Sequence, residues 1–131
     1  MTSINDTILI QTLSDSYRGQ LGRYRSLDDI VRQLISRLVL SRGDLSQAAS
    51  GFREKQTLLG AIERERTRVA DLVAQWELRK TAIGHSAIAD DFDALLHQVA
   101  DAIRRFLEDE TQLQQYLEGI IARSQTPMPS S

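Results

Sequence analysis

The side chains best placed for chemistry in this chain are one histidine and two carboxylates, Asp93, His97 and Asp101. Their spacing of four puts them on one face of a helix, where an imidazole and two carboxylates can bind a metal ion. No Glu-x-x-His pair accompanies them, so the di-iron bundle pattern is absent. The chain has no cysteine, which excludes thiolate zinc sites and cysteine nucleophiles. We interpret these residues as a solvated acidic helix face and expect no metal site and no cofactor.

Neighbouring acids at 90–91 and 108–110 are the other candidates for chemistry. General acid–base catalysis needs such groups in a cleft that perturbs them. Here Arg104 and Arg105 lie four residues before Glu108 and Asp109, the spacing of ion pairs on a helix surface. The sequence also lacks a Gly-x-Ser-x-Gly or Ser-x-x-Lys motif and a glycine-rich phosphate loop. We therefore predict no catalytic residues and a protein that is not an enzyme.

Charge is distributed unevenly along the chain, although the net charge is only −2. Residues 18–42 contain six arginines and two aspartates, whereas residues 86–123 contain eight acids and three arginines. These segments could attract each other or each could face a partner. An arginine-based nucleic-acid binder using 18–42 is one hypothesis, but the whole chain is too acidic to favour it, and we expect no nucleic-acid partner. No apolar run reaches the roughly 18 residues that cross a bilayer, and the N-terminus lacks signal-peptide features. We expect a cytoplasmic protein without membrane insertion.

The elements that carry these residues follow from hydrophobic periodicity. Both prolines, Pro127 and Pro129, lie near the C-terminus, so the first 126 residues have no proline to break a helix. Apolar residues alternate at steps of three and four along 4–41, the repeat of helices that pack along a common axis. This first seam reads Ile10, Leu13, Tyr17, Gln20, Tyr24, Leu27, Val31, Leu34, Leu38 and Ser41. Gly19, Gly22 and a possible N-cap at Ser26 predict a break or kink near residue 25.

Two further helices are predicted over about 44–82 and 86–123. Gly43 and Asp44 can end one helix and cap the next, and Gly84 and Ser86 repeat this arrangement. The second seam is interrupted by three basic residues, whose stems can lie along an apolar groove while the charges stay in water. The third seam reads Phe92, Leu96, Val99, Ile103, Phe106, Glu110, Leu113, Leu117 and Ile120. Residues 124–131 are predicted to be a disordered tail.

The predicted fold is therefore all-α, an elongated antiparallel bundle or coiled coil of three long helices in one domain, 1–123. Additional apolar residues beside the first and third seams make both faces wide. Either the three helices close on one another as a complete core, or they leave a groove for a helix from a partner or a second copy. The second alternative includes a self-associating structural coiled-coil protein.

One stretch resembles a known family. Leu38-Val-Leu-Ser-Arg-Gly-Asp-Leu45, followed by Phe52-Arg-Glu-Lys-Gln-Thr-Leu-Leu-Gly-Ala-Ile-Glu-Arg-Glu-Arg66, is similar to flagellar export chaperones of the FlgN type. Those chains share a long first helix, a Gly-Asp turn and a Glu-Lys-x-x-Leu-Leu run. The resemblance covers roughly residues 28–121, and its most specific part is 43–66. Thr111-Gln-Leu-Gln-Gln-Tyr116 departs from the Asn-containing stretch that family members often carry.

The resemblance implies a chaperone for type III secreted clients in the cytoplasm, binding the terminal helices of hook–filament junction proteins without turnover or nucleotide. The family's client contact lies in its C-terminal helical region. Carried over, it implies a partner-binding face formed by Ile103, Phe106, Leu107, Leu113, Tyr116, Leu117, Ile120 and Ile121. The same side chains could instead join copies of this chain in a homo-oligomer.

Overall fold

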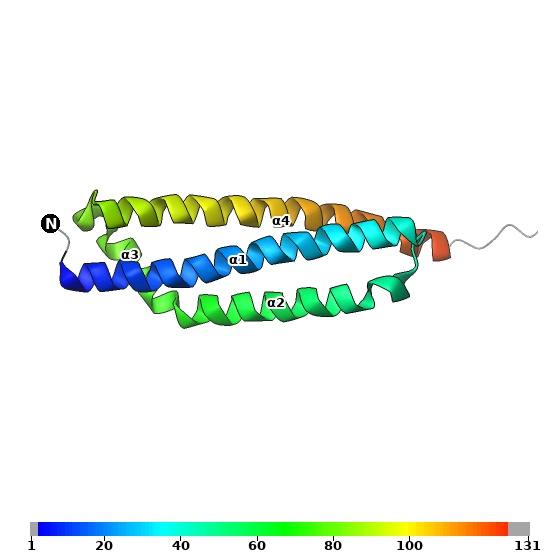
Figure 1. Cartoon of the computed structure of the whole chain (residues 1–131), viewed down its shortest axis with the longest axis horizontal. Helices are drawn as coiled ribbons and strands as arrows, with labels where there is room; N and C mark the ends of the chain where they lie inside the picture. The colour runs from blue at the N-terminus through cyan, green and yellow to red at the C-terminus, as the bar shows by residue number, and fades with distance from the viewer. Residues whose placement is uncertain (1–2, 126–131) are drawn as a thin grey trace, which may run out of the picture.

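The computed structural model describes residues 3–125, and these form an elongated, entirely helical bundle (Figure 1). Its elements are α1 (Ile4–Leu40), the short 3₁₀ helix η1 (Leu45–Ala48), α2 (Ala49–Arg68), α3 (Ala70–Ile83) and α4 (Ala87–Gln125). No strand occurs within the described range, so the predicted all-α class is confirmed. The prediction of three long helices is wrong, because the segment between the two long helices is divided. None of the described helices has the length and apolarity needed to cross a membrane.

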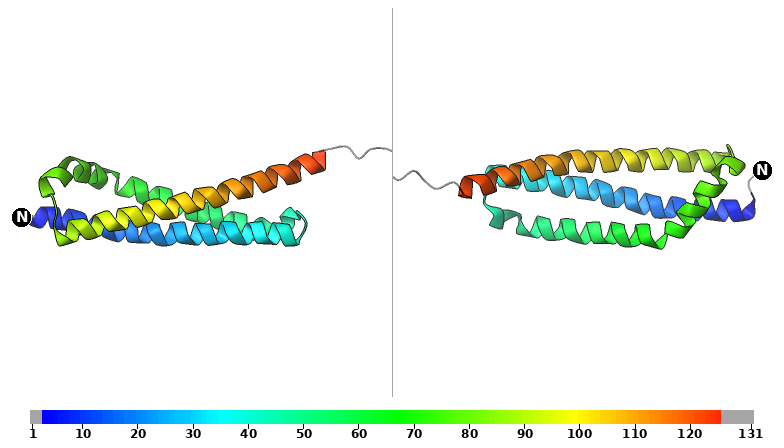
Figure 2. Two further views of the ribbon diagram at one scale, coloured as in Figure 1. Left: turned by 90° about the horizontal axis from the view of Figure 1, so that it is seen from above. Right: turned by 180° about the vertical axis from the view of Figure 1, so that it is seen from behind.

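Helix α1 is the centre of the bundle, with α4 along one side of it and α2 along the other (Figures 1 and 2). Ser3 caps it by accepting a hydrogen bond from the Asp6 amide at 3.1 Å. The apolar residues of the first predicted seam are buried, except for the half-buried Tyr17. The break predicted near residue 25 is absent, because α1 continues without interruption to Leu40. Ser26 is an exposed side chain within the helix, and Asp28 faces α4 rather than completing a cap.

The two long helices run in the same direction. Tyr17 packs against Phe92 with ring centroids 5.8 Å apart, and Arg32 Nε lies 3.0 Å from Asp109 Oδ2. The sequence separation between contacting residues of α1 and α4 is therefore nearly constant along the two helices. Further along, the Tyr116 hydroxyl donates to the Leu38 carbonyl at 3.4 Å. The antiparallel arrangement predicted for neighbours in the chain applies to α1 and α2. It does not apply to α1 and α4, because the intervening segment runs back the full length of the bundle before α4 begins (Figure 2).

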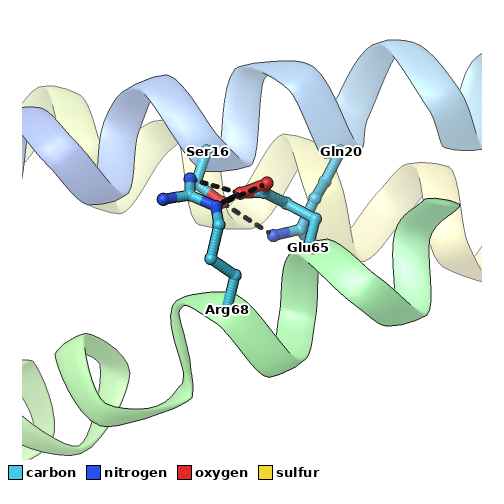
Figure 3. Close-up of polar contacts among 4 residues, drawn as sticks. All are labelled: Ser16, Gln20, Glu65 and Arg68. Atoms are coloured by element: carbon cyan, nitrogen blue, oxygen red, sulfur yellow. Dashed lines mark hydrogen bonds and ion pairs between the residues drawn. The ribbon is translucent and has the colours of Figure 1, made fainter.

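That returning segment is divided at Val69, where one continuous helix was predicted. Val69 is buried and has φ −101° and ψ 5°, outside regular helix geometry. A polar cluster fixes the end of α2 on α1 just before this point (Figure 3). Ser16 Oγ donates to Glu65 Oε1 at 3.3 Å and accepts from Gln20 Nε2 at 3.2 Å. Arg68 holds the same Glu65 carboxylate through its guanidinium and lowers the Glu65 pKa. Burial of Val69 and this anchoring redirect the chain into α3.

Helix α3 closes the end of the bundle where α1 and α4 begin. Trp76 and Phe92 form a T-shaped pair with ring centroids 5.1 Å apart, and Phe92 in turn contacts Tyr17. Arg79 and Asp6 form an ion pair of 2.6 Å between α3 and the first turns of α1. One aromatic residue from each of three helices thus forms the core here.

The predicted turns occur where the glycines indicated. After α1, Arg42 and Gly43 have φ angles of 57° and 88°, and the Gly43 amide donates to the Leu38 carbonyl at 2.7 Å. This is the Schellman arrangement, with Arg42 in the left-handed conformation. Asp44 caps η1 rather than α2, and Ser86 caps α4 by accepting from the Ala89 amide at 3.2 Å. The predicted tail included residues 124 and 125, which belong to α4, and the rest of that prediction, 126–131, lies outside the described residues.

Candidate partner-binding face of helix α4

The eight residues predicted to bind a partner divide into two groups on α4. Four of them, Phe106, Leu113, Tyr116 and Ile120, face inward. Phe106 packs against Tyr24 of α1 at 6.3 Å between ring centroids, and Leu113 is completely buried. Ile120 lies against Gly43, where an added Cβ would come within 3.2 Å of Ile120 Cγ1. These four side chains are part of the chain's own core.

The other four, Ile103, Leu107, Leu117 and Ile121, form a stripe beside that core. Leu107 is 54% exposed and Ile121 is 47% exposed, whereas Ile103 and Leu117 are half-buried. The stripe is part of a longer line of residues on α4, spaced alternately by four and three positions. This line consists of Leu96, Ala100, Ile103, Leu107, Glu110, Gln114, Leu117 and Ile121. This is a second heptad seam on α4, next to the one that packs on α1. We call these eight residues the outer seam.

A chain of polar contacts crosses the middle of the outer seam. Lys55 Nζ of α2 lies 2.5 Å from Glu110 Oε1, and Gln114 Nε2 donates to the same oxygen at 3.0 Å. Lys55 is only 5% exposed and its ammonium lies 5.9 Å from the centre of the Phe52 ring. The expectation that basic seam residues keep their charges in water is therefore wrong for Lys55. Its charge is instead neutralised by Glu110, which makes its burial tolerable.

Helix α2 supplies the opposite side of this surface. Gly51 and Leu58 lie on the side of α2 that meets α1, since a Cβ at Gly51 would fall 2.6 Å from Leu34 Cδ2 and Leu58 lines a cavity with Ile30 of α1. Phe52 and Leu59, which are half-buried, are placed by helical spacing on the other side of Lys55, towards α4. Both side chains therefore lie on the side of α2 from which Lys55 reaches Glu110.

A second hollow, of about 380 Å³, lies between α1 and α4 and has mixed charge. Three arginines and three aspartates line it: Arg25, Arg32, Arg105, Asp28, Asp29 and Asp101. Because these opposite charges are equal in number, the hollow has no net positive charge to attract an anion such as a nucleic-acid phosphate. Two of the arginines of 18–42 take part in ion pairs within the chain, Arg18 with Asp15 and Arg32 with Asp28 and Asp109.

In this hollow the Asp28 carboxyl group is destabilised when ionised. Burial first, and then the adjacent Asp109 carboxylate, raise the Asp28 pKa to about 6, against the opposing effect of Arg32. The pKa of Asp109 is lowered, chiefly by its hydrogen bond with Asp28 and also by Arg32. Asp28 Oδ1 is buried and has no hydrogen-bond partner in the described part of the chain. The two carboxyl groups and Arg32 therefore form a pH-sensitive link between α1 and α4.

The histidines make local contacts. His97 Nδ1 lies 2.8 Å from the Asp93 carbonyl oxygen, and His85 Nδ1 lies 3.0 Å from Asp90 Oδ1, which raises the His85 pKa. Both side chains are exposed. Among residues 3–125 no three histidine or acidic side chains come together in a way that could hold a metal ion.

No family model, curated protein or solved structure matches this chain. The arrangement of side chains on α4 is therefore the main support for a function, together with the motif resemblance in 43–66.

Sequence reasoning missed the polar chain that crosses the outer seam. Its signal was present, because Lys55 interrupts the second predicted seam and Glu110 interrupts the third. Two seam interruptions of opposite charge are expected to pair when their helices pack side by side. Gln114 carries no such signal, since an exposed glutamine on a helix is ordinary.

Proposed function

We propose that this chain is a cytoplasmic export chaperone of the FlgN type, which binds a terminal helix of a type III secreted client such as a hook–filament junction protein. The observation that carries the proposal is the outer seam, where Leu107 and Ile121 are exposed beside the half-buried Ile103 and Leu117. Aliphatic side chains at this spacing are what an amphipathic helix needs in order to pack. The class of client comes from the resemblance of 43–66. Binding is stoichiometric and involves no reaction.

Burial of these side chains supplies the driving force. Full burial of an exposed leucine or isoleucine contributes about 1.5–3 kcal/mol. Leu107 and Ile121 are about half exposed, so each has roughly half of that contribution left to gain, or about 1 kcal/mol. Replacing both with glutamine is therefore expected to weaken binding by about 10–50-fold.

Isothermal titration calorimetry with the terminal helix of a hook-associated protein tests the proposal. The wild-type chain is expected to bind with one-to-one stoichiometry, and the Leu107→Gln/Ile121→Gln variant to bind weakly. Leu78→Gln is the matched control, because Leu78 is 86% exposed on α3, away from the outer seam. Absence of wild-type binding at high micromolar concentration, or an equal loss in the control, would contradict the proposal.

Self-association is the second candidate, favoured by the regular three-and-four spacing of the outer seam from Leu96 to Ile121. A structural coiled-coil protein would pair copies through this seam. Sedimentation separates the two functions. A monomer or weak dimer that changes mass only when the client helix is added supports the chaperone, whereas a tight oligomer of the chain alone supports the structural coiled coil.

A further inference from the structure

The polar contacts in the outer seam extend from the core to the surface. Lys55 is buried, Glu110 is half-buried and Gln114 is exposed, and hydrogen bonds join them in that order. Gln114 lies seven residues after Leu107 and seven before Ile121, so it occupies the same line of the helix. A partner helix that covers both aliphatic residues must also cover Gln114. We call Lys55, Glu110 and Gln114 the polar layer.

A covered polar layer favours some partners over others. An amide that is buried against an aliphatic side chain loses its hydrogen bonds to water and gains none in return. An amide on the partner at the same level restores them. The layer is also incomplete in itself, since Glu110 Oε2 is buried and has no hydrogen-bond partner among residues 3–125. In coiled coils a single polar residue in an apolar seam fixes the register and the choice of partner in this way.

We infer that the polar layer selects the partner of this chain and sets its register: the partner is an amphipathic helix whose aliphatic seam is interrupted once, by an amide residue such as asparagine that lies opposite Gln114. The inference rests on the proposed function, because it takes the outer seam as the docking surface. It adds a chemical requirement that aliphatic contacts alone do not impose. Leu107 and Ile121 provide affinity on either side of the layer, and Gln114 provides discrimination.

Two synthetic peptides test this requirement. Both are amphipathic helices of about four heptads with a leucine and isoleucine seam, long enough to be helical. They differ at one central seam position, which is asparagine in one and leucine in the other. The full chain is expected to bind the asparagine peptide about tenfold more tightly than the leucine peptide. Gln114→Leu is expected to reverse this preference, because the unpaired amide is then on the peptide.

Gln115→Leu is the matched control. Gln115 is exposed one position further along α4, on a line of the helix that does not join Leu107 and Ile121. This variant is expected to keep the wild-type preference. Since Gln114 and Gln115 are both exposed, neither substitution disturbs the core, and circular dichroism verifies that both variants remain helical.

The possible outcomes separate the inference from the proposed function. Equal binding of both peptides by the wild-type chain, or an asparagine preference that survives in Gln114→Leu, overturns the polar-layer inference and leaves the docking surface in place. Failure of all variants to bind either peptide overturns both. A tight dimer of the wild-type chain that Gln114→Leu alters would assign the layer to contacts between copies, which also overturns the inference.

Discussion

The link between Asp28 and Asp109 makes a quantitative prediction about pH. Replacing Asp28 with asparagine removes a carboxylate that the folded state destabilises but keeps the ion pair between Arg32 and Asp109. The Asp28 pKa is raised from 3.8 to about 6. At about 1.4 kcal/mol for each pKa unit, the upper limit of the effect is about 3 kcal/mol. Arg32 is largely exposed, so solvent screens the site, and we expect Asp28→Asn to stabilise the fold by about 1–2 kcal/mol near pH 7.

The sign of the pH dependence follows from proton binding. A raised pKa means that the folded chain binds the Asp28 proton more strongly than the unfolded chain does, so this group lowers stability as the pH rises from about 4 to about 6. The stabilisation by Asp28→Asn should therefore disappear below about pH 4, where Asp28 is protonated in both states. Asp109→Asn should act in the opposite direction. Because the Asp109 pKa is lowered, the Asp109 carboxylate stabilises the fold at pH values above its pKa in the unfolded chain. This stabilisation is lost as the pH falls.

Urea unfolding followed by circular dichroism, repeated at several pH values between about 4 and 7, measures these effects. Asp29→Asn is the control, because Asp29 is the exposed neighbour of Asp28 and its replacement removes the same formal charge. A stability gain in Asp28→Asn that is independent of pH, or an equal gain in Asp29→Asn, would refute the assignment. So would a loss of stability near pH 7.

Three further substitutions test the packing. Gly51→Ala should lower the free energy of unfolding by about 1–2 kcal/mol, because the new Cβ would lie 2.6 Å from Leu34 Cδ2. A Cβ at Gly22 would meet no atom within 4 Å, so Gly22→Ala should raise the free energy of unfolding by about 0.5–1 kcal/mol. The two glycine variants should therefore shift the urea midpoint in opposite directions. Lys55→Met leaves the half-buried Glu110 without its cation and should lower the free energy of unfolding by about 2 kcal/mol in the same measurement. Adding Glu110→Gln should recover part of that loss, and additive losses would contradict direct pairing.

The sequence predicts the buried seam of α1 well because its signal is local. Large apolar residues recur along one face, and the same residues are buried in the structure. The glycine-centred turns are equally local, since their positive φ angles depend on a few residues. The division at Val69 is different. It depends on where the end of α2 is held by Ser16, 49 residues before Glu65 in the chain, and the periodicity within the segment carries no information about that contact.

The division of the apolar residues of α4 into buried and exposed ones was not predicted, for a similar reason. Large side chains suggest that Ile103 belongs to the inner seam of α4, yet the smaller Ala102 is the buried residue at that level. Parallel packing against α1 turns α4 so that Ala102 and Phe106 point inward, which moves Ile103 and Leu107 towards the outside. The rotation of a helix with two apolar stripes is decided by its neighbours, so the sequence shows which residues of α4 are apolar but does not separate core from surface.

The parallel pairing of α1 and α4 has a consequence for how the chain folds. The aromatic contacts between α1 and α4 join residues 75 and 82 positions apart, Tyr17 with Phe92 and Tyr24 with Phe106. Contacts of such long sequence separation raise the contact order and predict slower folding than in a bundle whose contacts join consecutive helices. During synthesis on the ribosome, α1 emerges long before α4 can cover it. Its leucines and tyrosines are then exposed to nascent-chain binding factors until the last helix has been made.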